Sequence, residues 1–211
     1  MGLNFKFFNS SFKLIRVGIT GGIGSGKTSV CQVFERLGVP VYYADVRAKQ
    51  LMEEDKELIA SIKHLIGENA YDEHGNLNRK LIADTVFSDE EKLLKLNSLV
   101  HPAVARDYES WNEILQRKNY PYSIKEAALL VETGSYKQLD KLIVVTADLE
   151  SRISRVMARD NATREQVLAR INAQIPEEQK AELADFVIRN DAIMELVPQV
   201  TKIHFQLLQA Q

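Results

Sequence analysis

Cysteine is almost absent from this chain, since Cys31 is the one cysteine among 211 residues. A single thiol excludes an internal disulfide and a thiolate metal cluster. An excess of charge is also missing: the formal net charge is −2 at pH 7, which argues against a nucleic-acid partner bound by bulk charge. Internal repeats, low-complexity tracts and long linkers are absent too. Hydrophobic residues at 45% and charged residues at 27% are typical of one ordinary α/β domain.

Residues 1–13 lack a long apolar run. Their four phenylalanines are interrupted by Lys and Asn, so the segment is too short and polar for a signal sequence or a membrane span. The myristoylation pattern requires Ser or Thr at position 6, where Lys6 stands. We expect a short N-terminal extension, no membrane partner and a cytoplasmic location.

One glycine-rich stretch dominates the rest of the sequence, Gly21-Gly22-Ile23-Gly24-Ser25-Gly26-Lys27-Thr28. It fits G-x-x-x-x-G-K-[ST], the phosphate-binding P-loop. A short apolar strand precedes it over 14–20, and Val30, Val33 and Phe34 follow at helical spacing, as this loop requires. In such a loop Lys27 reaches the β- and γ-phosphates and the Thr28 hydroxyl is a ligand of Mg²⁺. The motif predicts a nucleoside triphosphate site.

Two acidic residues follow predicted strands. The strand over 39–43 runs into Ala44-Asp45, where the carboxylate could accept the proton of an attacking hydroxyl or could cap the next helix. The strand predicted over 124–131 ends at Glu132, which could hold Mg²⁺ through water or cap Thr133-Gly134. Local sequence leaves both pairs of roles open.

The stretch from Val46 to about Lys118 has helical periodicity without strand-like alternation, so we expect an insertion of helices beside the sheet. His101-Pro102 should end one of these helices and start another. Further strands are expected at 141–146 and 184–188. Beyond 192 a last helical segment should be kinked or restarted at Pro198.

Five arginines fall between the last two predicted strands, and Arg155 and Arg159 share one helix face. Two guanidinium groups on a helical hairpin can close over transferring phosphates and exclude water. The alternative is a solvated surface balanced by nearby acidic residues. Because a P-loop is present, we interpret this hairpin as a lid.

Beyond the P-loop, an ordered set of residues resembles the dephospho-CoA kinase family. The set covers nearly all of the chain after Lys13: Ala44-Asp45, Asp72, Gly75, Leu77, Arg79, Leu96-Asn97, His101-Pro102, Leu129-Leu130, Glu132, Arg155, Arg159, Gln174, Ala184-Asp185 and Asn190. The resemblance implies a P-loop NTPase fold, three layers α/β/α around a five-stranded parallel sheet of order 2-3-1-4-5. It implies a core over 14–45, 122–150 and 184–211, a helical substrate-binding insertion over about 46–121 and a lid over about 151–183.

The resemblance also implies a reaction: ATP, with Mg²⁺, phosphorylates the ribose 3′-hydroxyl of dephospho-CoA. In catalysis it implies Asp45 as base, with Lys27, Arg155 and Arg159. The substrate-binding residues that it implies are Asp45, Arg79, His101 and Glu132. The ATP contacts that it implies are Gly22, Ile23, Gly24, Ser25, Gly26, Lys27, Thr28, Ser29 and Asn190. The family often has other residues where Tyr43, Asn78 and Arg152 stand here, which affects fine substrate contacts. We expect a monomer or a weak homo-oligomer.

Two other readings are disfavoured. A nucleotide kinase needs arginines arranged for the acceptor's phosphate, but the arginines of the helical insertion, among them Arg47, Arg79 and Arg106, are well separated. A regulatory GTPase needs an N-K-x-D guanine motif, which the sequence lacks.

Overall fold

The computed structural model describes residues 13–87, 89–191 and 195–210. Five parallel strands form its sheet in the order β2-β3-β1-β4-β5, which confirms the expected topology. The strands are β1 (Ile15–Thr20), β2 (Val41–Tyr43), β3 (Tyr122–Glu126), β4 (Lys141–Thr146) and β5 (Phe186–Arg189). All five end at the same edge of the sheet, where an open α/β fold binds its ligands.

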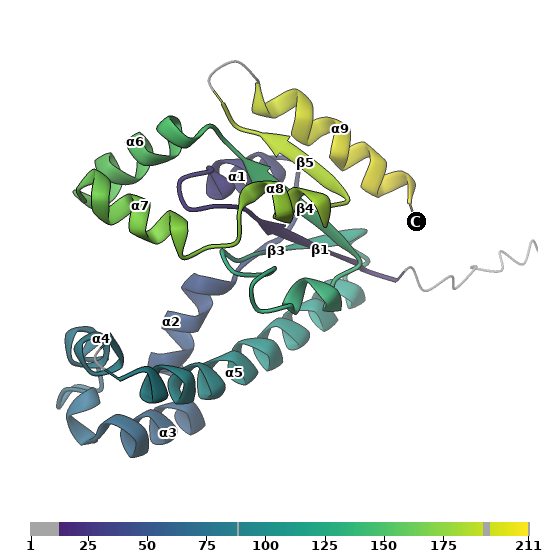
Figure 1. The fold of residues 1–211 in the computed structure, drawn as a ribbon. Coiled ribbons are helices and arrows are strands. Elements are labelled where there is room, and N and C mark those ends of the chain that lie inside the picture. The colour runs from purple at the N-terminus through teal and green to yellow at the C-terminus, as the bar shows by residue number, and fades with distance from the viewer. Residues whose placement is uncertain (1–12, 88, 192–194, 211) are drawn as a thin grey trace, which may run out of the picture.

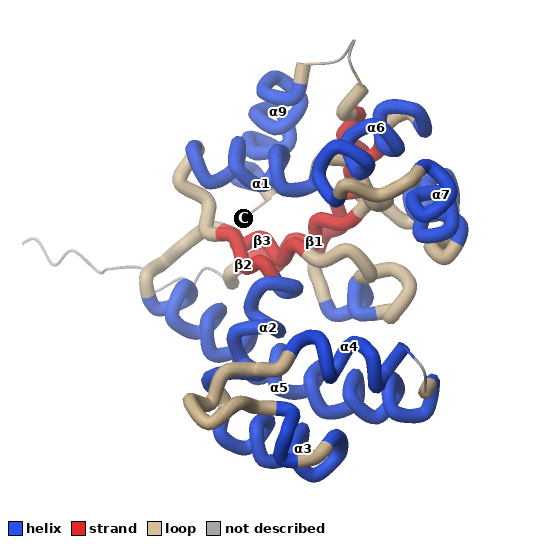
Figure 2. The backbone as a smooth tube through the Cα atoms, turned by 90° about the vertical axis from the view of Figure 1, so that its left-hand side faces the viewer, coloured by secondary structure: helices blue, strands red, loops and turns tan. Residues whose placement is uncertain are grey.

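Helices α1 (Lys27–Arg36) and α9 (Leu196–Gln209) cover one face of the sheet (Figure 2). Between them and the strands lies the main core, which includes the fully buried Val17, Phe34, Ile143 and Ile188. Gly38 follows α1 with φ 83°, the left-handed conformation in which helices commonly end. Pro198 lies in the first turn of α9, where its missing N–H costs nothing.

A group of helices extends from the opposite face (Figures 1 and 2): α2 (Ala44–Glu54), α3 (Lys56–Ile66), η1 (Glu68–Ala70), α4 (Arg79–Phe87) and α5 (Glu90–Arg117). They share a second core, which contains Leu58, Ile62, Leu96 and Val100. The helical periodicity of this stretch is therefore confirmed.

The last helical group follows β4 and adjoins the P-loop (Figure 1). It consists of α6 (Leu149–Asp160), α7 (Arg164–Asn172) and the short α8 (Glu177–Glu182), while η2 (Ser135–Gln138) precedes β4. Thr163 and Gln166 form a reciprocal capping box that starts α7 after the turn. Ile153, Val156 and Val167 pack together between α6 and α7.

Two predicted boundaries are wrong. Helix α5 continues through His101 and Pro102, because Val100, Ala103 and Val104 are buried and this packing outweighs the backbone hydrogen bond that proline removes. Strand β3 ends at Glu126 rather than Val131. Beyond it the backbone turns, with the Thr133 N–H donating to the Leu129 carbonyl at 3.0 Å.

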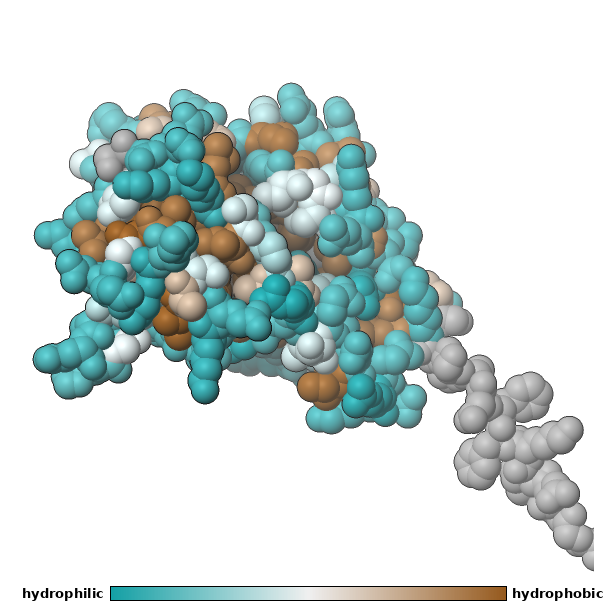
Figure 3. Space-filling view, turned by 90° about the horizontal axis from the view of Figure 1, so that it is seen from below, coloured by the Kyte–Doolittle hydropathy of each residue, from teal (hydrophilic) through white to brown (hydrophobic). Residues whose placement is uncertain are grey.

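None of the helices that the structure describes is long and apolar enough to cross a bilayer. Seen from below, the molecule is mostly hydrophilic, with separate hydrophobic patches (Figure 3). Of the predicted N-terminal extension, residues 1–12 lie outside the described residues. Lys13 forms an ion pair with Asp140 at 2.8 Å.

Candidate active site

The P-loop runs from β1 into α1 and is held from the β5 side. Gly26 has φ 91°, and a Cβ placed there would collide with the Asn190 side-chain amide, so this position needs glycine on both grounds. The Asn190 amide in turn donates to the Ser25 carbonyl at 2.8 Å. Thr28 and Ser29 are exposed in the first turn of α1, where backbone N–H groups and the helix dipole favour an anion.

Lys27 folds back along its own loop. Its ammonium group donates to the carbonyls of Gly21 at 3.0 Å and Gly22 at 3.2 Å. Burial lowers the pKa of Lys27, and the negative charges of Glu126 and Asp45 oppose that shift. The lysine is therefore a desolvated cation flanked by acids at the carboxyl edge of the sheet.

Glu126 is a member of this site that the sequence interpretation missed. It ends β3, lies opposite Ile19 of β1 and Tyr43 of β2, and is 8% exposed. Burial raises its pKa, which the Lys27 charge lowers and the Asp45 charge raises. The apolar run after Glu126 concealed it by extending the predicted strand.

Asp45 is the second residue of α2 and is exposed. The N-cap of α2 is Tyr43, without a side-chain hydrogen bond to the helix, so the role of Asp45 as a helix cap is wrong. Since β2 lies beside β3, the structure places Asp45 on the same edge as Glu126 and Lys27.

The arginines of α6 differ in their contacts. Arg155 donates to the Asn190 carbonyl at 2.8 Å and to the Gly24 carbonyl at 3.3 Å. Arg159 instead pairs with Asp160, with hydrogen bonds of 2.7 and 3.0 Å, so only Arg155 of the two contacts the P-loop here.

Arg152 and Glu177 form a buried pair over the P-loop, at 3.2 Å, with side chains 8% and 11% exposed. Arg152 also donates to the Ile23 carbonyl at 3.0 Å, and Glu177 accepts from the Ala147 N–H at 3.3 Å. The sequence interpretation selected Arg155 and Arg159 as the lid arginines and missed Arg152. Its signal is its place one helical turn before Val156, on the buried face of α6.

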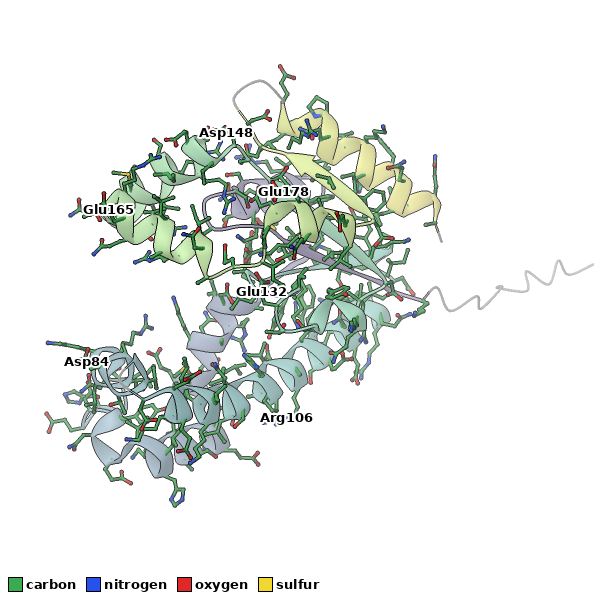
Figure 4. All side chains as sticks on the ribbon, in the orientation of Figure 1. Asp84, Arg106, Glu132, Asp148, Glu165 and Glu178 are labelled. Atoms are coloured by element: carbon green, nitrogen blue, oxygen red, sulfur yellow. The ribbon has the colours of Figure 1, made fainter. Side chains whose placement is uncertain are left out.

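The residues expected to bind the acceptor do not gather in one place. Arg79 starts α4 and pairs with Glu53 at 3.1 Å, and His101 is exposed on α5, so both lie in the helical group. Glu132 lies below α8, beside the sheet (Figure 4), where it pairs with Lys180. The described residues contain no cluster of three or more side chains suited to hold a metal ion by themselves.

A parallel sheet of this order, with a P-loop after its central strand and an arginine-bearing helical hairpin beside the loop, defines a P-loop kinase. Residues 15–195 match the family model described as dephospho-CoA kinase. The chain belongs to that family, whose members use ATP to phosphorylate dephospho-CoA in the last step of coenzyme A synthesis.

Individual relatives agree with the family match. A dephospho-CoA kinase of Chlorobium chlorochromatii is 41% identical over 198 residues, which cover 92% of this chain and 93% of that protein. The crystal structure of TT1252 from Thermus thermophilus is similar with a TM-score of 0.79 and 38% identity, over 92% of this chain and 98% of that one. The dephospho-CoA kinase from Campylobacter jejuni has a TM-score of 0.71 and 25% identity over the same shares.

Proposed function

We propose that this chain transfers the γ-phosphoryl group of ATP to the ribose 3′-hydroxyl of dephospho-CoA, giving coenzyme A and ADP. The observation that supports this most is the convergence of Lys27, Glu126 and Asp45 at the edge of the sheet where three adjacent strands end. A bond forms between the 3′-oxygen and the γ-phosphorus, the bond from that phosphorus to the β–γ bridging oxygen breaks, and the hydroxyl proton moves to a carboxylate.

The donor half is built by the P-loop. Backbone N–H groups over 22–29 surround the phosphates, Lys27 approaches the β- and γ-phosphates, and Asn190 supports the loop from β5. The residues here fit Mg²⁺, which prefers oxygen ligands. The exposed Thr28 hydroxyl, next to Lys27, could bind the ion directly, and the Glu126 carboxylate on the neighbouring strand could hold it through water. Bound Mg²⁺ supplies charge neutralisation of the β- and γ-phosphates.

Asp45 is the base in this proposal. Its carboxylate is exposed at the start of α2 and does not cap that helix, whereas Glu126 is buried and has a raised pKa. The exposed acid can therefore reach an incoming hydroxyl, and the buried acid keeps Lys27 charged.

The lid supplies positive charge to the transferring group. Arg155 already lies on the P-loop, and Arg159 leaves Asp160 when the lid closes. Arg79 and His101 contact the acceptor from the helical group. Glu132 has no direct acceptor contact in this proposal, because its carboxylate oxygens are buried against Lys180.

The test is a phosphorylation assay with ATP and Mg²⁺ in which dephospho-CoA, AMP, CMP and pantothenate are offered separately. We expect product from dephospho-CoA alone. The Lys27→Ala control should lower turnover about a hundredfold, ~3 kcal/mol, the usual loss for one preorganised charge-stabilising donor. Phosphorylation of AMP or CMP in place of dephospho-CoA would refute the proposal, and near-normal turnover by Lys27→Ala would refute the P-loop role.

A further inference from the structure

Lys180 of α8 is a completely buried lysine, 0% exposed. Its Nζ lies 2.5 Å from Oε1 of Glu132, and both carboxylate oxygens of Glu132 are buried. Within the part of the chain that the structure describes, none of these three atoms has a hydrogen-bond partner outside this ion pair. The ion pair therefore offsets the cost of removing these two charges from water.

Stability alone gives no reason for this pair. It lies beside a small apolar core of Leu130, Val131, Leu142 and Val144, packed by Ile175 and Ala184 from either side of α8. In such surroundings, replacing an ion pair by apolar residues of similar volume is often neutral or stabilising. A reason for a charged pair at this position is therefore to be sought in the groups that it positions.

The pair joins the two halves of the reaction centre. On one side, α8 also carries Glu177, which holds Arg152 and through it the Ile23 carbonyl of the P-loop. On the other side, Glu132 belongs to the turn over 127–134, which begins directly after Glu126. The Lys180 charge is also close enough to lower the pKa of Lys27. Figure 4 shows Glu132 between α8 and the helical group.

We infer that Lys180 is a positioning residue of the kinase reaction: through its ion pair with Glu132 it fixes the turn over 127–134, and with it the Glu126 carboxylate, relative to the P-loop. This inference rests on the proposed function. It places the effect of Lys180 on the phosphoryl-transfer step and not on ATP binding, since Asn190 and Arg155 hold the P-loop without any contact from α8.

The experiment compares Lys180→Met, Lys180→Arg, Glu132→Gln and the double variant Glu132→Gln/Lys180→Met with the unaltered enzyme. Initial rates are measured with each substrate varied in turn, and thermal unfolding is measured on the same samples. Lys141→Met is a control for the same Lys-to-Met change, because it breaks a more exposed Lys–Asp185 pair of 2.7 Å at the start of β4, away from the carboxyl ends of the strands.

We expect Lys180→Met to lower both the melting temperature and kcat, the latter about tenfold, while the KM for ATP changes less than about twofold. The double variant leaves no uncompensated buried charge, so its melting temperature should return close to that of the unaltered enzyme while kcat stays low. Lys180→Arg should keep more of kcat than Lys180→Met, and Lys141→Met should keep all of it.

Recovery of kcat together with stability in the double variant would overturn the inference, because Lys180 would then be merely structural. A rise in the KM for ATP as the main effect would overturn it as well. If Lys180→Met fails to fold, the double variant and Lys180→Arg decide between these outcomes. An unaltered chain without dephospho-CoA kinase activity would instead refute the proposed function.

Discussion

Asp45 is exposed and makes no capping bond, so its chemistry can be separated from its contribution to folding. If it is the base, Asp45→Asn should lower kcat about a hundredfold, within the range for a lost general base, with the KM for ATP nearly unchanged. Steady-state kinetics and thermal unfolding of the same preparation measure both effects. A lower melting temperature with full activity per folded molecule would assign Asp45 a structural role.

Glu126 gives a pH-dependent signature at the residue scale. Burial raises its pKa above the ordinary value of 4.5, so its contribution to stability is fully present below about that pH and is lost as the pH rises through the higher, folded-state pKa. Glu126→Gln removes the cost of a buried carboxylate. We expect it to raise the melting temperature at neutral pH, with a difference that shrinks toward pH 4.5.

The same substitution should lower kcat at least tenfold, because Lys27 loses the carboxylate that opposes its desolvation. Melting temperatures across a pH series test the predicted effect of Glu126→Gln on stability, and rates at neutral pH test its predicted effect on kcat. A variant less stable than the unaltered chain at every pH would show that the attraction between the Glu126 and Lys27 charges outweighs the cost of burying Glu126.

At the scale of elements, α6 and α7 carry an exposed charge network that holds Arg159 away from the P-loop. Asp160 binds Arg159 and also Arg170, the latter at 2.8 Å. Arg159→Ala should therefore leave the melting temperature nearly unchanged, since exposed pairs contribute ~0–1 kcal/mol. It should lower kcat at least tenfold if the lid delivers this charge to the phosphates.

Arg170→Ala is the matched control for the lid, because it removes the other partner of Asp160 and should leave kcat unchanged. Equal losses in the two variants would assign the effect to the hairpin's charge network and not to contact of Arg159 with phosphate. The comparison needs only rates at saturating substrates and one unfolding curve for each variant.

The elements also show where sequence reasoning succeeds and fails. The P-loop and the helices around it follow from local patterns, because glycine spacing and helical periodicity are short-range signals. The end of β3 does not, since the apolar run over 127–131 looks like a strand although the backbone turns there and Leu130 and Val131 fill a small core. The predicted strand therefore ended at Glu132, whereas the acid at the end of β3 is Glu126. The sheet order came from the family resemblance.

Other site residues depend on tertiary contacts that no local pattern contains. Arg152 looks like one of five surface arginines until α6 packs on the P-loop. Lys180 lies in a short charged helix that sequence periodicity does not reveal, and its burial depends on Glu132, which is far from it in the sequence. The helix break predicted at Pro102 is wrong because the buried residues on both sides of it keep α5 continuous.

At the scale of the whole molecule, the site is shared by three parts: the P-loop on the sheet, the hairpin of α6 and α7, and the helical group of α2 to α5. A ligand that contacts more than one part stabilises the folded chain by mass action, ~2.7 kcal/mol at a hundred times its Kd. For a chain of 211 residues this corresponds to a rise in melting temperature of about 5–10 °C. ATP and dephospho-CoA should each produce such a shift.

Removal of divalent cations should separate folding from catalysis in this molecule. The described residues hold no cluster of three acidic, His or Cys ligands, so a chelator should leave the melting temperature of the ligand-free protein unchanged. It should abolish turnover and reduce the shift caused by ATP, because Thr28 and the phosphates together would hold Mg²⁺. Added Mg²⁺ should restore both. A chelator that lowers the melting temperature of the ligand-free chain would reveal a structural metal, and turnover that survives chelation would show that the phosphoryl transfer relies on Lys27 and the lid arginines alone.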